Sequence, residues 1–259
     1  MYFSAEALKA LRSKESEIEL IYQHLSSSYN NLNFRNARSR EFAMHGLSRR
    51  LHTMTRAIKR VFSILPPEQK DIPDKDVLSD ATINIQSFIF NTFGAIDNIG
   101  WIWASETGQK NSKGAPIPDK FVGLGPKNTS IRQTLSVDFQ KYLTTLDEWF
   151  ENQTNYRHAL AHRIPPYIPP YIISESDRIK FEEICKMINT AYLEKRWSDH
   201  QILTRERDRM KRFAPVIQHS FYEETNPIRF HPQMIADFLT VQQIAQRMLR
   251  ELNELREGA

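Results

Sequence analysis

One arginine and two histidines lie close together between Asn155 and Arg163. Arg157 is followed directly by His158, and His162 comes about one helical turn later. Arginine offers a fixed fork of N–H donors to phosphate oxygens, and histidine exchanges protons near neutral pH. Together these side chains could bind a phosphate group and exchange protons with a bound ligand.

The helix expected to carry these residues begins at Ser136 and ends near His162, before a double proline. Its apolar side chains recur at helical spacing and define an inward face: Phe139, Leu143, Leu146 and Phe150. Arg157 comes seven residues after Phe150 and falls on that face. An unpaired buried charge is costly, so Arg157 requires a partner. Asp97, the one acidic residue in the apolar stretch of the preceding helix, is the expected partner.

Arg157, His158 and His162 fit the Arg-x(4–6)-His motif of the HEPN superfamily of helical-bundle proteins. The segment from Phe93 to Trp101, with Asp97 followed by Asn98, resembles the "ALDNxxW" helix of small uncharacterised prokaryotic proteins in that superfamily. The resemblance covers about residues 36–195.

The resemblance implies a ribonuclease that works without metal, as a dimer that brings two motifs to one cleft. Arg157 would bind the scissile phosphate, His162 would act in proton transfer, and His158 would orient either group. Asp97, Asn98 and Asn155 would support the site. It also implies a setting in prokaryotic stress or phage defence. The alternative is a non-catalytic scaffold or protein-interaction module that keeps Arg157 and Asp97 as a structural pair.

Metal and cofactor sites are weakly supported. His158 and His162 have the spacing of a helical metal-ligand pair, but Glu151 lies two turns from His158 and no third ligand is evident. The segment Gly123–Gly125 lacks the third glycine of a dinucleotide-binding loop, and no Gly-Lys-Ser/Thr follows. We therefore expect no metal and no cofactor.

The second helix carries a basic face, since only Glu41 is acidic between Arg35 and Arg60. Such a face is either a solvated surface or a track for an RNA backbone. The absence of aromatic residues between Arg49 and Arg60 argues against base stacking there. The candidate nucleic-acid-binding residues are Arg49, Arg50, Arg56, Lys59 and Arg60.

The chain of 259 residues is 40% hydrophobic with 8 Gly, which favours long helices over hairpins. We predict one all-α domain over residues 1–259, an up-and-down bundle of about five long helices. A long loop at 108–135 follows the third helix, and a strand-like stretch at 215–230 precedes the last. Residues 196–231 are a possible accessory insertion. The predicted helices span 4–28, 36–65, 74–105, 136–162, 174–197 and the stretch after Pro232.

Compartment and assembly follow from simple counts. The single cysteine, Cys185, excludes an internal disulfide and a cysteine-based zinc cluster. The N-terminus has no signal-peptide pattern, and the longest uncharged apolar run, 81–96, is broken by polar residues. We therefore expect a cytoplasmic protein that does not cross a membrane.

The net charge of +4 fits an anionic partner such as RNA. The nearly all-round apolarity of helix 74–105 predicts a homodimer through the third and fourth helices.

Overall fold

The computed structural model describes residues 2–110, 114–115, 117–218 and 227–257. It is mostly helical, which confirms the all-α class. Within those residues, no helix combines the length and apolarity needed to span a bilayer.

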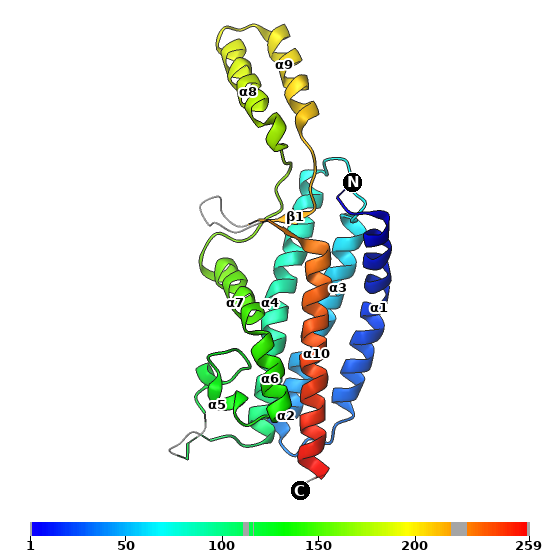
Figure 1. The fold of residues 1–259 in the computed structure, drawn as a ribbon, viewed down its shortest axis with the longest axis vertical. Coiled ribbons are helices and arrows are strands. Elements are labelled where there is room, and N and C mark those ends of the chain that lie inside the picture. The colour runs from blue at the N-terminus through cyan, green and yellow to red at the C-terminus, as the bar shows by residue number, and fades with distance from the viewer. Residues whose placement is uncertain (1, 111–113, 116, 219–226, 258–259) are drawn as a thin grey trace.

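Long helices form a bundle along the long axis of the molecule (Figure 1). α2, η1 and α3 follow one another without a break, and the middle turn, η1, is a π-helix. α1, α4 and α10 run toward the end that holds the C-terminus, while α3 runs the opposite way. The bounds are α1 Ala5–Asn30, α2 Ala37–Glu41, η1 Phe42–Leu47, α3 Ser48–Ile64, α4 Lys75–Glu106 and α10 Phe230–Glu257.

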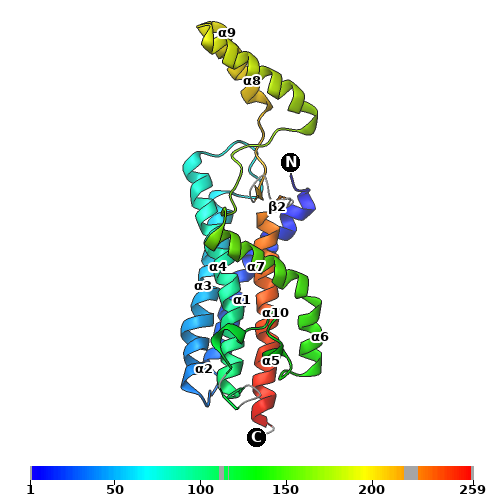
Figure 2. The same cartoon turned by 90° about the vertical axis from the view of Figure 1, so that its left-hand side faces the viewer.

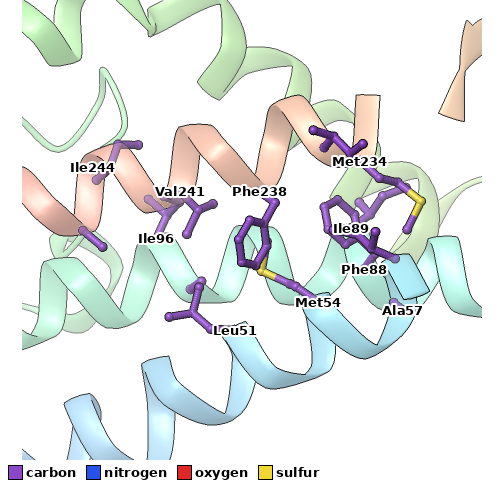
Figure 3. Packing of buried hydrophobic residues seen from close by; sticks show 14 of the residues in the cluster. Leu51, Met54, Ala57, Phe88, Ile89, Ile96, Met234, Phe238, Val241 and Ile244 are labelled. Carbon is purple, nitrogen blue, oxygen red and sulfur yellow. The ribbon is translucent and has the colours of Figure 1, made fainter. Parts of the chain in front are cut away.

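The core lies between α3, α4 and α10, where apolar side chains at spacings of three and four interdigitate (Figure 3). The stripe predicted for the second helix is confirmed, because all its members are fully buried: Leu47, Leu51, Met54, Ile58, Val61 and Leu65. Burial of each such side chain contributes about 1.5–3 kcal/mol, so this stripe fixes how α3 faces its neighbours.

α4 is the central helix, as predicted, and contacts α2, η1, α3, α7 and α10. It is not covered on every side, however. Ile83 is 62% exposed and Phe90 is 42% exposed. They lie seven residues apart and therefore share one face of α4. α4 therefore keeps one apolar face open to solvent.

The helix predicted over 136–162 is two helices, α6 Val137–Thr145 and α7 Asp147–His162, separated at Leu146. The Ser136 hydroxyl caps α6 by accepting from the backbone N–H of Phe139 at 3.3 Å. Phe150 and Arg157 both belong to α7 and share one face, but Phe150 is buried whereas Arg157 is half-buried. Arg157 therefore does not lie at the centre of a buried face, as the prediction had it.

η3 Glu175–Asp177, α8 Arg178–Leu193 and α9 Trp197–Met210 form an arm beyond one end of the bundle (Figures 1 and 2). α8 packs against α9, so the fifth predicted helix belongs to this arm and not to the bundle. The start of the possible insertion at 196–231 falls between α8 and α9, inside the arm.

Two short strands follow the arm, β1 Val216–Ile217 and β2 Ile228–Arg229, and they pair antiparallel. Both strands fall within the strand-like stretch predicted at 215–230. Residues 219–226 of that stretch lie outside the described residues.

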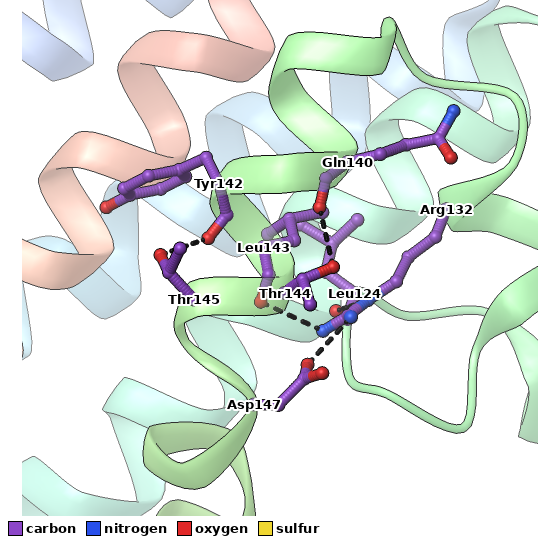
Figure 4. Close-up of polar contacts among 8 residues, drawn as sticks. All are labelled: Leu124, Arg132, Gln140, Tyr142, Leu143, Thr144, Thr145 and Asp147. Atoms are coloured by element: carbon purple, nitrogen blue, oxygen red, sulfur yellow. Dashed lines mark hydrogen bonds and ion pairs between the residues drawn. The ribbon is translucent and has the colours of Figure 1, made fainter.

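The loop after α4 is tied to the rest of the fold (Figure 4). It contains η2 Asp119–Phe121 and α5 Thr129–Arg132. The buried Arg132 donates from Nε to the carbonyl of Leu124 at 2.8 Å and pairs with Asp147 at 2.7 Å. A Cβ on Gly100 would lie 2.8 Å from the Cα of Gly123, so the loop backbone contacts α4 directly. The loop thus forms a fixed wall between α4 and α7; residues 111–113 and 116 of the predicted loop lie outside the described residues.

Candidate active site on α4 and α7

His158 and His162 lie at the carboxyl end of α7, where the proline segment turns the chain away. Both side chains are exposed, and their ring centroids are 6.0 Å apart. The exit of the chain is fixed by Gln86 of α4, which donates from Nε2 to the carbonyl of Pro166 at 3.0 Å. The two imidazoles therefore stand side by side at the surface, open to a ligand.

Arg157 turns toward α4, where its guanidinium carbon lies 5.0 Å from the centroid of the Phe93 ring. The expected ion pair with Asp97 is not formed, because no oxygen of Asp97 lies within 4.0 Å of the Arg157 nitrogens. The two charges still interact, since Arg157 lowers the pKa of Asp97. The contact with an aromatic face leaves the N–H fork of Arg157 available to an anion.

Asp97 is a carboxylate with unused acceptor capacity. Burial raises its pKa to about 6, and the cations of Arg157 and then Arg50 oppose that rise. Among the described residues, no donor lies within hydrogen-bond distance of its oxygens. At neutral pH the group is mostly ionised, half-buried and open to a ligand that donates hydrogen bonds.

Arg50 of α3 approaches the same part of α4. Its Nε donates to Oδ1 of Asn98 at 3.0 Å, and its Nη1 donates to Oδ1 of Asn91 at 3.4 Å. A Cβ on Gly94 would lie 2.3 Å from the Arg50 guanidinium carbon, so a larger residue there would displace the Arg50 side chain. Asn98, predicted to support the motif on α7, instead positions Arg50.

A cavity of about 340 Å³ opens between α4, the loop after it and α7. We call it the cleft cavity. α4 contributes its floor, including Asp97, while Trp149 and the predicted residue Asn155 stand on the α7 side. Its lining residues are Phe93, Ile96, Asp97, Leu124, Gly125, Pro126, Lys127, Asn128, Trp149, Phe150, Glu151, Gln153, Thr154 and Asn155.

A second cavity, of about 460 Å³, lies between η1, α3 and α4. Arg49 and Arg50 line it together with His45, whose Nδ1 is 3.3 Å from Nη2 of Arg49. Arg38 also lines it but pairs with Glu41 at 2.7 Å. Within the part of the chain that the structure describes, Arg49 and Arg50 have no carboxylate within 4 Å, so their charges favour an anion in this cavity.

The other predicted nucleic-acid-binding residues are not gathered there. Arg56 is exposed farther along α3. Lys59 faces α1 and pairs with Glu19 at 2.5 Å, and Arg60 pairs with Asp80 at 3.4 Å. The basic face thus divides into a cluster at Arg49 and Arg50 and a stretch whose charges are partly neutralised.

Sequence reasoning missed several side chains of the site, including Asn91, Phe93, Lys127 and Trp149. Gly94 inside an apolar helix was a usable signal, because a helical glycine often marks a close approach. Among the described residues, no three or more His, Cys, Asp or Glu side chains gather closely enough to hold a metal ion.

Comparison with protein-family models, with curated proteins and with solved structures found no match to this chain. The interpretation of the site therefore depends on its geometry and on the resemblance of its motif.

Proposed function

We propose that this protein is a HEPN-like endoribonuclease that cleaves RNA without a metal ion. The observation that carries the proposal is the placement of two exposed imidazoles beside an arginine that is held on an aromatic ring rather than in an ion pair. The arginine suits binding of the phosphate, and the histidines suit the proton transfers.

In the proposed reaction, Arg157 binds the scissile phosphate through its N–H fork. His162 takes the proton from the ribose 2′-hydroxyl, whose oxygen attacks the adjacent phosphorus. The bond from phosphorus to the 5′-oxygen breaks, and His158 in its protonated form gives that oxygen a proton. The products are a 2′,3′-cyclic phosphate and a 5′-hydroxyl.

Electrostatics support binding of an RNA backbone. Arg49 and Arg50 line one cavity, and Arg56 continues the exposed face of α3. Contacts of this kind release counterions, so affinity should fall as salt rises. Lys59 and Arg60 should contribute less because they already pair with carboxylates.

A homodimer is part of the proposal. Ile83 and Phe90 expose apolar surface on α4 between α3 and α7, and a two-fold contact there would bring two copies of the Arg157 motif near each other. A monomer in sedimentation at tens of micromolar would count against it. A cytoplasmic setting in prokaryotic stress or phage defence depends on the resemblance alone.

The second candidate function is a non-catalytic interaction module, and the arm favours it. α9 has no buried residue, and both arm helices expose large apolar side chains. Exposed apolar surface often marks an interaction site. These side chains are Ile179, Met187, Tyr192, Leu193, Trp197 and Ile202.

Incubation with total RNA in excess chelator separates the two candidates. Wild type and the control His24→Ala, which removes an exposed histidine from α1, should both degrade the RNA. His162→Ala should not. Equal degradation by all three proteins, or none by wild type in chelator, would leave the interaction module as the better candidate.

A further inference from the structure

The cleft cavity combines aromatic walls with two carboxylates, the half-buried Asp97 and the exposed Glu151. Its aromatic lining residues are Phe93, Trp149 and Phe150. The loop after α4 contributes residues 124–126. Its volume of about 340 Å³ is in the range of small-ligand sites. Aromatic walls of this kind suit a flat heteroaromatic ring, as in proteins that splay out and stack single-stranded bases.

The carboxylate of Asp97 restricts which ring fits. It accepts hydrogen bonds and has no donor within reach among the described residues. Guanine presents two adjacent donors, N1–H and the N2 amino group, to one carboxylate. On uracil the single N3–H stands between two carbonyl oxygens, and on adenine and cytosine the amino group stands beside an unprotonated ring nitrogen. A carboxylate repels such acceptors, so it favours guanine.

The cavity continues into the histidine pair along one face of α7. Glu151, Asn155, His158 and His162 recur at spacings of four, three and four, so they share a face. The first two line the cavity. His158 and His162 lie about 4.5 and 10.5 Å beyond Asn155 along the helix axis. A nucleotide with its base in the cavity would therefore extend its sugar and phosphate toward His158.

We propose that the cleft cavity binds a guanine base through Asp97 and its aromatic walls, and that this base belongs to the nucleotide presented to His158 and His162. The assignment of the nucleotide rests on the proposed ribonuclease function. The recognition of guanine rests on the cavity alone. Asp97 is thus a specificity-determining residue and not a catalytic one.

Isothermal titration calorimetry with mononucleotides tests the base. Guanosine monophosphate should bind most tightly, inosine monophosphate more weakly because it lacks the N2 amino group, and adenosine monophosphate most weakly. Asp97→Asn should weaken binding of guanosine monophosphate by roughly tenfold or more. The control Glu148→Gln changes an exposed carboxylate of α7 outside the cavity and should bind like wild type.

A second experiment, with RNA strands, tests whether the cavity binds a guanine within a strand as well as a free nucleotide. A single-stranded RNA with one guanosine is compared with the same strand carrying inosine. Weaker binding of the inosine strand by wild type, but not by Asp97→Asn, supports the proposal even if free nucleotides bind poorly. The proposal is overturned if nucleotides do not discriminate and the two strands bind alike.

The two proposals can fail separately. Discrimination for guanine without any RNA cleavage would contradict the ribonuclease and leave the guanine cavity standing. If wild type and Asp97→Asn both cleave RNA equally fast at every base, the guanine cavity is contradicted but the ribonuclease is not. Thermal melts confirm that each variant is folded.

Discussion

Two carboxylates, the half-buried Asp97 and the buried Asp237, both have a pKa of about 6, and desolvation by burial is the main cause in both. Their surroundings differ. Asp237 of α10 is 4% exposed and accepts hydrogen bonds from Nε1 of Trp149 and Nε2 of Gln233, both at 2.8 Å. Asp97 has two cations nearby but no donor among the described residues. Asp237 is satisfied by the fold, whereas Asp97 keeps acceptor capacity that no described residue uses.

The indole of Trp149 connects the two regions. Its nitrogen donates to Asp237 in the interior, and its ring lines the cleft cavity. The interior around Asp237 therefore holds the Trp149 ring in place, and that ring forms part of the wall of the cleft cavity. Loss of interior hydrogen bonds should lower stability, and loss of the exposed histidines should lower activity.

The largest effect is expected at the histidine pair. His162→Ala should lower the rate of RNA cleavage at least roughly a hundredfold, because it removes the proton-transfer group. Its free energy of unfolding should stay within about 0.5 kcal/mol of wild type, since the side chain is exposed. Cleavage assays and urea unfolding measure the two quantities. If His162→Ala instead lost enough stability to explain its loss of activity, His162 would act through the fold and not through proton transfer.

The next effect is expected in the interior. Asp237→Ala removes the acceptor of Trp149 and Gln233 and leaves buried donors unpaired. The free energy of unfolding should fall by about 2–4 kcal/mol, as measured by urea titration. The fraction that remains folded should keep most of its cleavage rate. A change below about 1 kcal/mol would show that the hydrogen bonds at Asp237 do not hold the wall.

Asp97→Asn should instead stabilise the protein above pH 6. The pKa of Asp97 is about 6 in the folded chain against an ordinary value of 3.8, so folding favours the protonated form. Wild type thus loses stability relative to the variant as pH rises from about 4 to 6. The gain at pH 7.5 should be at most about 3 kcal/mol, which is what a rise in pKa from 3.8 to about 6 corresponds to, and it should vanish below pH 4. A destabilised variant at pH 7.5 would mean that the Asp97 charge contributes a net attraction to Arg157 and Arg50.

The smallest effect is expected on the basic face of α3. Arg56→Ala should reduce the slope of log affinity against log salt for single-stranded RNA by about 0.7, the contribution of one phosphate contact. Lys59→Ala is the matched control and should change the slope less, because Lys59 pairs with Glu19. Filter binding over a range of salt concentrations measures both. Equal changes would argue for diffuse charge effects rather than a defined track.

The long helices could be predicted because their signals are local. The Leu47–Leu65 stripe repeats at spacings of four and three and ends at a double proline, and the structure buries every member. The break at Leu146 has no such signal, since neither glycine nor proline stands there. It is accompanied by a long-range contact, the ion pair of Asp147 with Arg132. The sequence pattern of α8 likewise does not reveal that its partner is α9.

The site divides in the same way. Arg157, His158 and His162 cluster because they are neighbours on one helix. The approach of Arg50 to Asp97 depends on how α3 packs on α4, which a single helix pattern does not specify. The pairing of Lys59 with Glu19 needs the position of α1 as well. The expected ion pair of Arg157 and Asp97 is replaced by a contact with Phe93, because a half-buried guanidinium can be stabilised by an aromatic face.

The most direct test of the central claim is cleavage of a defined RNA in excess chelator, with one ribose at the cleaved position replaced by 2′-deoxyribose. Wild type should cut the all-ribose strand to give a 2′,3′-cyclic phosphate and a 5′-hydroxyl, and it should not cut at the deoxy position. His162→Ala should cut neither strand. Cleavage at the deoxy position, or cleavage of the all-ribose strand by His162→Ala at the wild-type rate, would contradict a 2′-hydroxyl mechanism at this site.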